Sequence, residues 1–332
     1  MSVRGLLQKP RGWSGEESPF HAGERAVQER LGVRERMEQA GRRLMRDYMP
    51  DEHREFFEDL PFVIAASADA RGALWASVLV GEPGFVRAPE PRQLVVRAHA
   101  LPGDPFADNV AVGAPLGLLG IELATRRRNR VNGRIGHVAE GGLELLVEQS
   151  FGNCKQYIQA RAGRFAAENA QMPPTLETAS LSAEAVSVLE RTDTTFIATG
   201  SSHARAGSSE GLDASHRGGR PGFIRVEQDS SGSTLVLPDF SGNNMFNSFG
   251  NLEVNPRAGL LALDFRCGAV LSLSGVANVI WDAAARDAFA GAERLLEFRP
   301  RSGWLWRGVL QDWSAAEESP HLRGTGPWRA AT

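Results

Sequence analysis

Short apolar stretches separated by Gly, Pro or Asp turns dominate the chain from residue 62 to residue 149. They are rich in β-branched residues and lack long helical patterns between them, which is typical of strands. The predicted strands are 62–67, 73–80, 84–88, 93–98, 116–124, 128–138 and 143–149. Seven short strands at this spacing predict an antiparallel barrel or sandwich and disfavour a parallel doubly wound sheet.

A second series of strands is predicted at 195–199, 222–226, 234–237, 259–265, 269–280 and 295–306. Residues 213–225 are an altered copy of 75–87. Further blocks match in the same order, 62–67 with 196–201, 117–123 with 259–265, and 131–133 with 273–275. We infer a tandem duplication of a whole domain, because repeats of the solenoid kind need at least about three units. The first block is identical at Ala76/Ala214, Ser77/Ser215, Gly81/Gly219, Pro83/Pro221, Gly84/Gly222, Phe85/Phe223 and Arg87/Arg225.

Helical patterns precede both series of strands. An imperfect apolar stripe over 24–47 predicts one or two helices packed on the first β domain, and 50–60 has Pro50 and acidic residues at its start. Residues 182–190 predict a helix capped by Ser182, and 153–161 a helix that leaves the first domain. The predicted organisation is a helical arm (1–54), a first β domain (55–161), a linker (162–181) and a second β domain (182–332), with a polar loop at 200–213.

Composition narrows the class of protein. Of the 332 residues 42% are hydrophobic and 23% charged, as in ordinary soluble proteins. A net charge of −3 gives no overall attraction to nucleic acid or to an anionic membrane. No apolar run suits a signal peptide or a membrane span, which predicts a cytoplasmic protein. Cys154 and Cys267 form no CxxC pair, so we expect buried thiols rather than a disulfide or a zinc site.

The two copies of the repeated block differ most where polar side chains gather. Ser215, His216, Arg217, Gly218 and Arg220 of the second copy combine hydroxyl, guanidinium and glycine backbone donors, a set suited to a phosphate dianion. The first copy has Val78, Leu79 and Glu82 at the places of His216, Arg217 and Arg220. A structural alternative for the second copy is a polar edge strand and turn. Three amides, Asn243, Asn244 and Asn247, follow farther along the chain and offer further donors and acceptors.

Other motifs leave two interpretations open. The run from Arg126 to Arg130 fits a solvated hairpin, or alternatively a strand end that reaches the same anion. Trp304 and Trp306 should face one side of a strand, either within the core or against a planar ligand. A G-x-S-x-G match at 207–211 lies in a polar loop, which disfavours a serine hydrolase, and no histidine spacing indicates a metal site.

Three blocks of the second copy, 214–223, 237–244 and 255–261, resemble the pyridoxamine 5′-phosphate oxidase-like family of FMN-binding split β-barrels. The resemblance implies two tandem split barrels that pack as an internal pseudo-dimer. It also implies FMN, rather than FAD, bound by Ser215, His216, Arg217, Gly218, Arg220, Asn243, Asn244 and Asn247. A cation expected just after Asn244 is missing here.

Two functions follow from this resemblance. One is an FMN-dependent oxidoreductase that acts on an unknown small substrate, in which the flavin performs the redox chemistry. The other is a non-catalytic flavin-binding or protein-interaction module of the same fold. Neither involves nucleic acid or a membrane, and a homodimer that pairs each copy with its counterpart in a second chain is the alternative to the internal pseudo-dimer.

Overall fold

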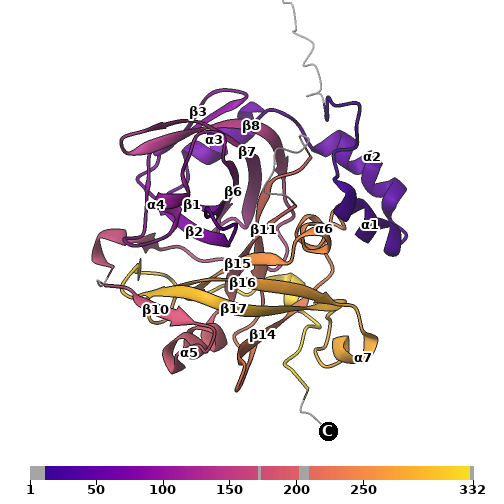
Figure 1. Ribbon diagram of the computed structural model, residues 1–332, viewed down its shortest axis with the longest axis vertical. Coiled ribbons are helices and arrows are strands. Elements are labelled where there is room, and N and C mark those ends of the chain that lie inside the picture. The colour runs from indigo at the N-terminus through magenta and orange to yellow at the C-terminus, as the bar shows by residue number, and fades with distance from the viewer. Residues whose placement is uncertain (1–11, 171–172, 202–208, 330–332) are drawn as a thin grey trace, which may run out of the picture.

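The computed structural model describes residues 12–170, 173–201 and 209–329. Half of the predicted polar loop at 200–213, residues 202–208, lies outside these residues. Figure 1 shows two β domains stacked along the long axis of the molecule, the first above the second, with helices α1 and α2 beside them. The predicted fold class, mainly β with short helices, is confirmed. No helix among the described residues is long and apolar enough to cross a membrane.

The first β domain is one antiparallel sheet that curls around a buried core. Its strands follow the order β3-β4-β8-β7-β6-β1-β2-β5. Val63, Leu79, Leu94, Leu118 and Leu145 are fully buried inside it. Its strands are β1 (Phe62–Ala68), β2 (Leu74–Val80), β3 (Val86–Glu90), β4 (Gln93–Val96), β5 (His99–Ala100), β6 (Pro115–Glu122), β7 (Arg127–Ala139) and β8 (Gly142–Gly152).

The second β domain repeats this arrangement with the strand order β12-β11-β15-β16-β17-β14-β13, and a further strand, β10, pairs with β17. Read from the other edge, the first sheet runs β5-β2-β1-β6-β7-β8-β4-β3, so the two orders match strand for strand apart from β5 and β10. The predicted tandem pair of split barrels is therefore confirmed. The strands are β10 (Thr175–Thr178), β11 (Thr194–Gly200), β12 (Leu212–Gly218), β13 (Arg225–Asp229), β14 (Gly232–Asp239), β15 (Arg257–Asp264), β16 (Ala269–Ile280) and β17 (Arg294–Trp306).

The two barrels pack on each other through matching strands. β12 contacts β6 and β7 of the first barrel, and its counterpart β2 contacts β15 and β16 of the second. A shared apolar cluster joins them and includes Ile64, Val78, Phe196 and Leu261. Glycines at equivalent places make the approach close: a Cβ at Gly117 would lie 2.3 Å from Leu212 O, and one at Gly259 would lie 2.8 Å from Ala76 N.

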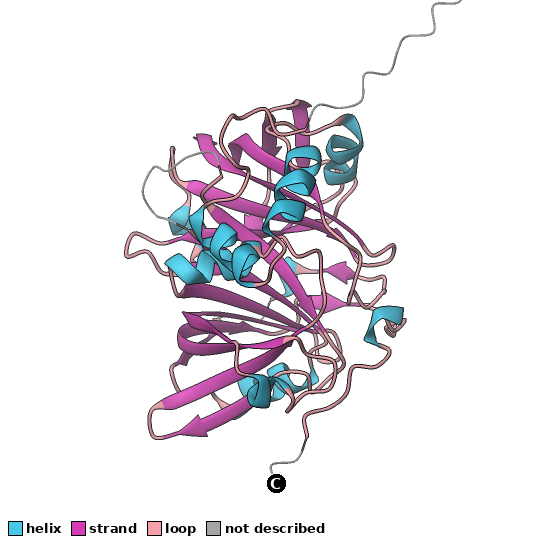
Figure 2. Cartoon of the chain, turned by 90° about the vertical axis from the view of Figure 1, so that its right-hand side faces the viewer, coloured by secondary structure: helices cyan, strands magenta, loops and turns pink. Residues whose placement is uncertain are grey.

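The N-terminal arm forms two helices that contact both barrels, whereas the prediction placed the arm on the first alone. α1 packs on α6 of the second barrel, and Met37 of α2 clusters with Phe151 of the first. Gly23 and Gly250 lie at the crossing of α1 with α6, where an added Cβ at Gly23 would lie 2.1 Å from Gly250 O. Figure 2 views the molecule from the side on which these helices lie. The helices are α1 (Ala22–Arg30), α2 (Arg34–Leu44), α3 (Asp51–Glu58), α4 (Phe106–Asn109), α5 (Ala183–Arg191), α6 (Asn247–Val254) and α7 (Ala283–Arg286).

Two local predictions were wrong, those of a helix at 153–161 and of buried cysteines. Residues 153–161 form no helix, because Tyr157 takes the left-handed backbone conformation (φ 62°) and a turn replaces the helix. The predicted linker contains β9 (Arg164–Phe165), the 3₁₀ helix η1 (Ala167–Asn169) and β10. The cysteines are not buried, since Cys267 is exposed and Cys154 is half-buried. Short elements in the C-terminal tail are β18 (Leu310–Gln311), which pairs with β9, and the 3₁₀ helix η2 (Pro320–Leu322).

Candidate functional site between the barrels

A polar cavity of about 130 Å³ opens where β12 of the second barrel meets β7 of the first. Each barrel supplies part of its wall, so the cavity depends on how the two barrels pack. The first barrel contributes Arg128 and Arg130 and residues from 153 to 157. The second contributes residues 215–218 of β12, the end of β14 at Asp239, the loop from 242 to 244 and the start of α6.

Strand β12 places alternating side chains at the cavity. Because successive strand residues face opposite sides, Ser215 and Arg217 share one face while His216 points the other way. The Ser215 hydroxyl lies 3.0 Å from that of Ser248 at the start of α6. Arg217 pairs with Asp239 and lies over the ring of Phe249, 4.9 Å from Cζ to the ring centroid. The strand thus contributes both a hydroxyl and a cation to the cavity wall.

Arginines outnumber the carboxylates that face them. Asp239 receives both Arg217 and Arg294, the latter with Nε 2.8 Å from Oδ2. Arg130 is buried and its Nη1 lies 2.9 Å from Asp213 Oδ1, while its Nη2 donates to Ser215 Oγ. Arg294 also pairs with Glu293. Three carboxylates therefore face three of the four arginines that line the cavity, Arg128 being the fourth.

Arg128 is the cation without a carboxylate partner among the described residues. Its Nε donates to the Cys154 carbonyl oxygen at 2.5 Å, and its Nη2 lies 3.4 Å from Cys154 Sγ. Burial lowers the pKa of Arg128, with smaller contributions from the positive charges of Arg130 and Arg217. A partly buried cation that only neutral groups contact favours the binding of an anion, since an opposite charge nearby offsets its lost hydration.

His216 is buried on the inner side of β12. Its ring meets that of Phe196 edge to face at 5.5 Å, and its Nε2 has no hydrogen-bond partner. Burial lowers the pKa of His216 well below its ordinary value, and Arg128 and Arg217 lower it further. The imidazole is therefore neutral at physiological pH.

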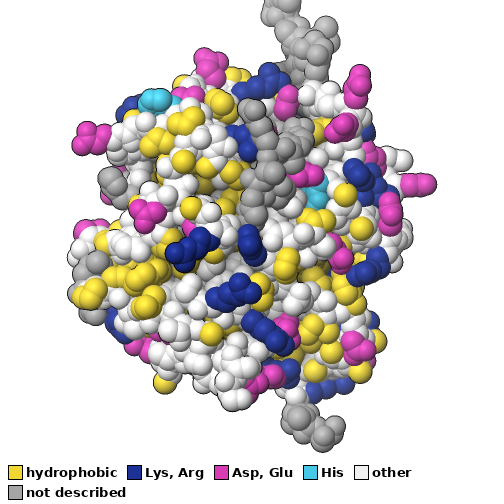
Figure 3. All heavy atoms as spheres, viewed as in Figure 1, with side chains coloured by type: hydrophobic (Ala, Val, Ile, Leu, Met, Phe, Trp, Pro, Cys, Tyr) yellow, Lys and Arg dark blue, Asp and Glu magenta, His cyan; other side chains and the backbone are white. Residues whose placement is uncertain are grey.

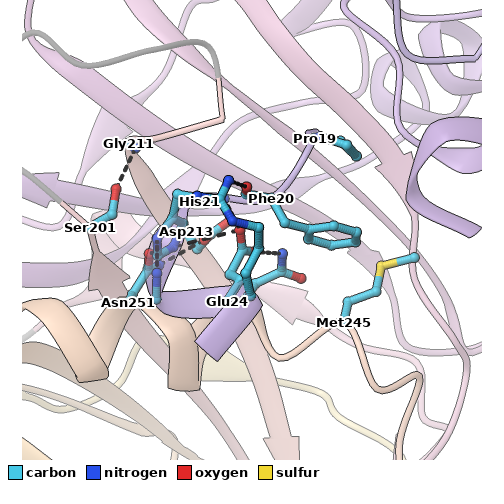
Figure 4. Close-up of polar contacts among 12 residues, drawn as sticks. Pro19, Phe20, His21, Glu24, Ser201, Gly211, Asp213, Met245 and Asn251 are labelled. Carbon is cyan, nitrogen blue, oxygen red and sulfur yellow. Dashed lines mark hydrogen bonds and ion pairs between the residues drawn. The ribbon is translucent and has the colours of Figure 1, made fainter. Parts of the chain in front are cut away.

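A buried polar network lies behind the cavity and ties the N-terminal arm to it (Figure 4). Besides Arg130, Asp213 accepts hydrogen bonds from Asn132 at 2.7 Å and from Asn251 at 2.8 Å. His21 Nε2 lies 2.9 Å from Asn251 Oδ1. Next to it, Glu24 on α1 accepts a hydrogen bond from Asn247, one of the residues that line the cavity.

Glu24 is a carboxyl group in this buried network. Burial raises its pKa to about 8, and the negative charge of Asp213 adds to the effect. Hydrogen bonds from the His21 backbone and from Asn247 act in the opposite direction. Glu24 is therefore largely protonated at neutral pH, and α1 meets α6 without a buried charge on this side chain.

On the other side of the barrel interface, uncharged side chains stand at the places of several residues of the cavity wall. Val270 and Ser272 of β16 stand where β7 has Arg128 and Arg130, and Val78 stands in place of His216. Trp306 pairs with Val270 as Asn153 pairs with Arg128. It is completely buried, and its Nε1 donates to the Pro102 carbonyl oxygen at 2.8 Å. The core interpretation of Trp306 is confirmed, and the duplication leaves this polar cavity on one side of the interface.

Most of the residues predicted from the sequence to form a site lie together at this cavity. Arg220 lies apart from them, where it pairs with Glu318, 2.7 Å from Nε to Oε2, and donates to the Thr325 carbonyl oxygen. Of the Arg126–Arg130 run, Arg128 and Arg130 reach the cavity while Arg126 pairs with Glu317. Ser248 was not predicted. The predicted residues in the cavity wall are Ser215, His216, Arg217, Gly218, Asn243, Asn244 and Asn247.

Comparisons with known proteins give distant structural neighbours. No protein family profile matches the sequence, and no curated protein matches it. HupZ of Group A Streptococcus has 11% identity and a TM-score of 0.26, and the match covers 36% of this chain and 90% of HupZ. HutZ, the heme storage protein of Vibrio cholerae, has 14% identity and a TM-score of 0.23, with 43% of this chain and 99% of HutZ covered. At these TM-scores the neighbours carry no argument. The assignment of tandem barrels therefore rests on the strand order of the chain itself.

Proposed function

We propose that this chain binds FMN by its phosphate group in the cavity between the barrels. The observation that carries this proposal is the convergence of Arg128, Arg130 and Arg217 with the hydroxyl of Ser215 on one cavity. Arginine recognises phosphate by charge-assisted hydrogen bonds, and hydroxyl groups add neutral donors. Arg128 would contribute most to affinity, because the other two already pair with carboxylates.

The size of the cavity favours the phosphate end of the ligand. Its volume of about 130 Å³ is below the roughly 300–1,000 Å³ of sites that enclose a whole small molecule. The amides of Asn243 and Asn244 lie in the same wall and offer contacts to polar groups next to a phosphate. In this proposal the cavity anchors the ligand, and the rest of FMN extends beyond it.

FMN, when bound, would supply the redox chemistry, so the chain would act as an oxidoreductase on a small substrate. The chain itself would hold the phosphate with Arg128 and Arg217 and orient Arg217 through Asp239. The alternative is a flavin-binding or protein-interaction module without turnover. Reduction of bound flavin by a small-molecule electron donor, followed by reoxidation by an acceptor, separates the two functions.

Haem is the other ligand to be weighed, because His216 is an imidazole at the cavity wall and imidazole is a common axial ligand of haem iron. The position of its Nε2 favours FMN instead. This nitrogen has almost no exposed surface. A haem iron would therefore require the atoms around it to move.

Three titrations of the purified chain test the proposal. FMN should bind saturably, with a change in flavin fluorescence, and riboflavin, which lacks the phosphate, should bind much more weakly. Haemin should give no saturable Soret shift. The proposal fails if FMN does not bind, or if riboflavin binds equally well. A saturable haemin complex without FMN binding would assign the cavity to haem.

A further inference from the structure

A second cavity, of about 210 Å³, lies at one end of the first barrel. Every residue in its lining is alanine, valine, leucine, phenylalanine or glycine. Leu79, Val96 and Leu143 belong to the apolar core of this barrel, and Phe106 of α4 closes one side. Val138 lines the cavity and is 40% exposed. The cavity thus extends the barrel core toward the surface.

The second barrel has charged side chains at the equivalent places, where they line the polar cavity between the barrels. There Arg217, Asp239 and Arg294 form an ion-paired group beside the rings of Phe246 and Phe249. In the first barrel Leu79 stands at the place of Arg217 in the repeated block. Ala98 stands at the place of Asp239. It lies two residues beyond Val96 of β4, and Asp239 lies two residues beyond Leu237 of the equivalent strand β14.

The position of the first barrel that is equivalent to Arg294 also lacks a long side chain. β7 and β8 pair as far as Ala139 and Gly142, at the end of the sheet. β8 is the counterpart of β17, which begins with Arg294. Small residues, Gly141 and Gly142, therefore stand at this end of the first barrel. Apolar and small residues have thus replaced a charged group of three long side chains. The first barrel keeps the space and none of its polar groups.

We propose that the first barrel binds a small uncharged apolar molecule, or the apolar end of a larger one, in this cavity. An apolar ligand is favoured because the lining side chains form no hydrogen bonds, which leaves only backbone groups as polar partners. Apolar cavities of about 150 Å³ bind benzene or xenon in a well-known engineered protein, and this cavity is larger. The proposal does not depend on FMN binding between the barrels.

Toluene is the probe for the test, with binding measured by calorimetry and by the rise in melting temperature that a ligand of the folded state causes. The full chain should bind toluene saturably at one site. Ala98→Phe and Ala107→Phe place a ring in the cavity from two different walls. Each should weaken toluene binding by about tenfold or more. Ala107 is exposed on α4, so its variant tests the proposal even if Ala98→Phe does not fold.

Ala111→Phe is the matched control, because Ala111 is exposed near the same helix and lies outside the cavity lining. It should bind toluene as the unmodified chain does. The proposal is overturned if the unmodified chain does not bind toluene, or if all three variants bind it equally. A different result would assign the cavity to a second copy of the chain. In that case the chain forms a dimer, Ala107→Phe disrupts the dimer, and toluene does not bind. Figure 3 shows that hydrophobic side chains gather on this face of the first barrel.

Discussion

Arg130 of the first barrel and Asp213 of the second form a buried ion pair across the barrel interface, with 2.9 Å between Nη1 and Oδ1. In the duplicated counterpart Ser272 replaces Arg130 and donates to the Ala76 carbonyl oxygen at 2.9 Å. The same interface is thus joined by an ion pair on one side and by a neutral hydrogen bond on the other. The ion pair lies beside the polar cavity, so it shapes the cavity as well as the interface.

Removal of Arg130 should destabilise the fold. Arg130→Met leaves Asp213 buried without its cation, which typically costs about 3–5 kcal/mol in unfolding free energy. Chemical denaturation measures this loss. The double variant Arg130→Met with Asp213→Asn should recover part of it, because no unpaired charge remains. Additive losses in the two single variants and the double variant would contradict a direct coupling of these side chains.

Close approach at the interface predicts a second effect on stability. An alanine at Gly117 would place its Cβ 2.3 Å from Leu212 O, and one at Gly259 would place it 2.8 Å from Ala76 N. Each substitution should lower the unfolding free energy by about 1–3 kcal/mol through overpacking. Gly152→Ala is the control, since its Cβ would lie 3.4 Å from its nearest neighbour, Asn129 Oδ1. Equal melting temperatures for all three variants would show that the barrels pack less closely.

The buried carboxyl group of Glu24 predicts a pH dependence of stability. Its pKa is about 8 in the folded chain, against an ordinary value of 4.5. Between these values the folded chain binds a proton that the unfolded chain releases, so the contribution of Glu24 to the unfolding free energy falls as the pH rises toward 8. Denaturation at a series of pH values should show this slope, and Glu24→Gln should reduce it.

The control for this profile is Glu29→Gln, on the exposed side of the same helix, which should keep the slope of the unmodified chain. If Glu24→Gln and the unmodified chain give parallel profiles over this pH range, the carboxyl group of Glu24 is not held protonated by the fold.

Much of the fold followed from the sequence because apolar periodicity and turn residues are local signals. The duplication also followed, since Ser77/Ser215 and Gly84/Gly222 kept the register of the two copies. Strand β12 was missing from the predicted series of strands. Its polar residues Asp213, Ser215 and Arg217 hide the alternating pattern. Asp213 and Ser215 face Arg130 of the other barrel instead of water, and Arg217 pairs with Asp239 of its own barrel.

The composition of the site followed less completely. The residues on β12 and in the 243–247 segment were found, because they gather within short stretches of sequence. Arg128 and Arg130 left two interpretations open, since a basic run on a hairpin looks the same whether its end is solvated or packed on another domain. The contacts of Arg220 and the role of Glu24 depend on segments distant in sequence, Glu318 and Asn247, which no local pattern connects.

The comparison of Arg128→Ala with Arg220→Ala in an FMN titration tests the central claim most directly. Arg128 lines the cavity without a carboxylate partner among the described residues, whereas Arg220 pairs with Glu318 away from it. Loss of a charge-assisted contact worth about 1.5–3 kcal/mol should raise the FMN dissociation constant of Arg128→Ala roughly 10- to 150-fold, with little change for riboflavin. Arg220→Ala should bind FMN as the unmodified chain does. Equal FMN affinity in the unmodified chain and in a folded Arg128→Ala variant would contradict phosphate binding between the barrels.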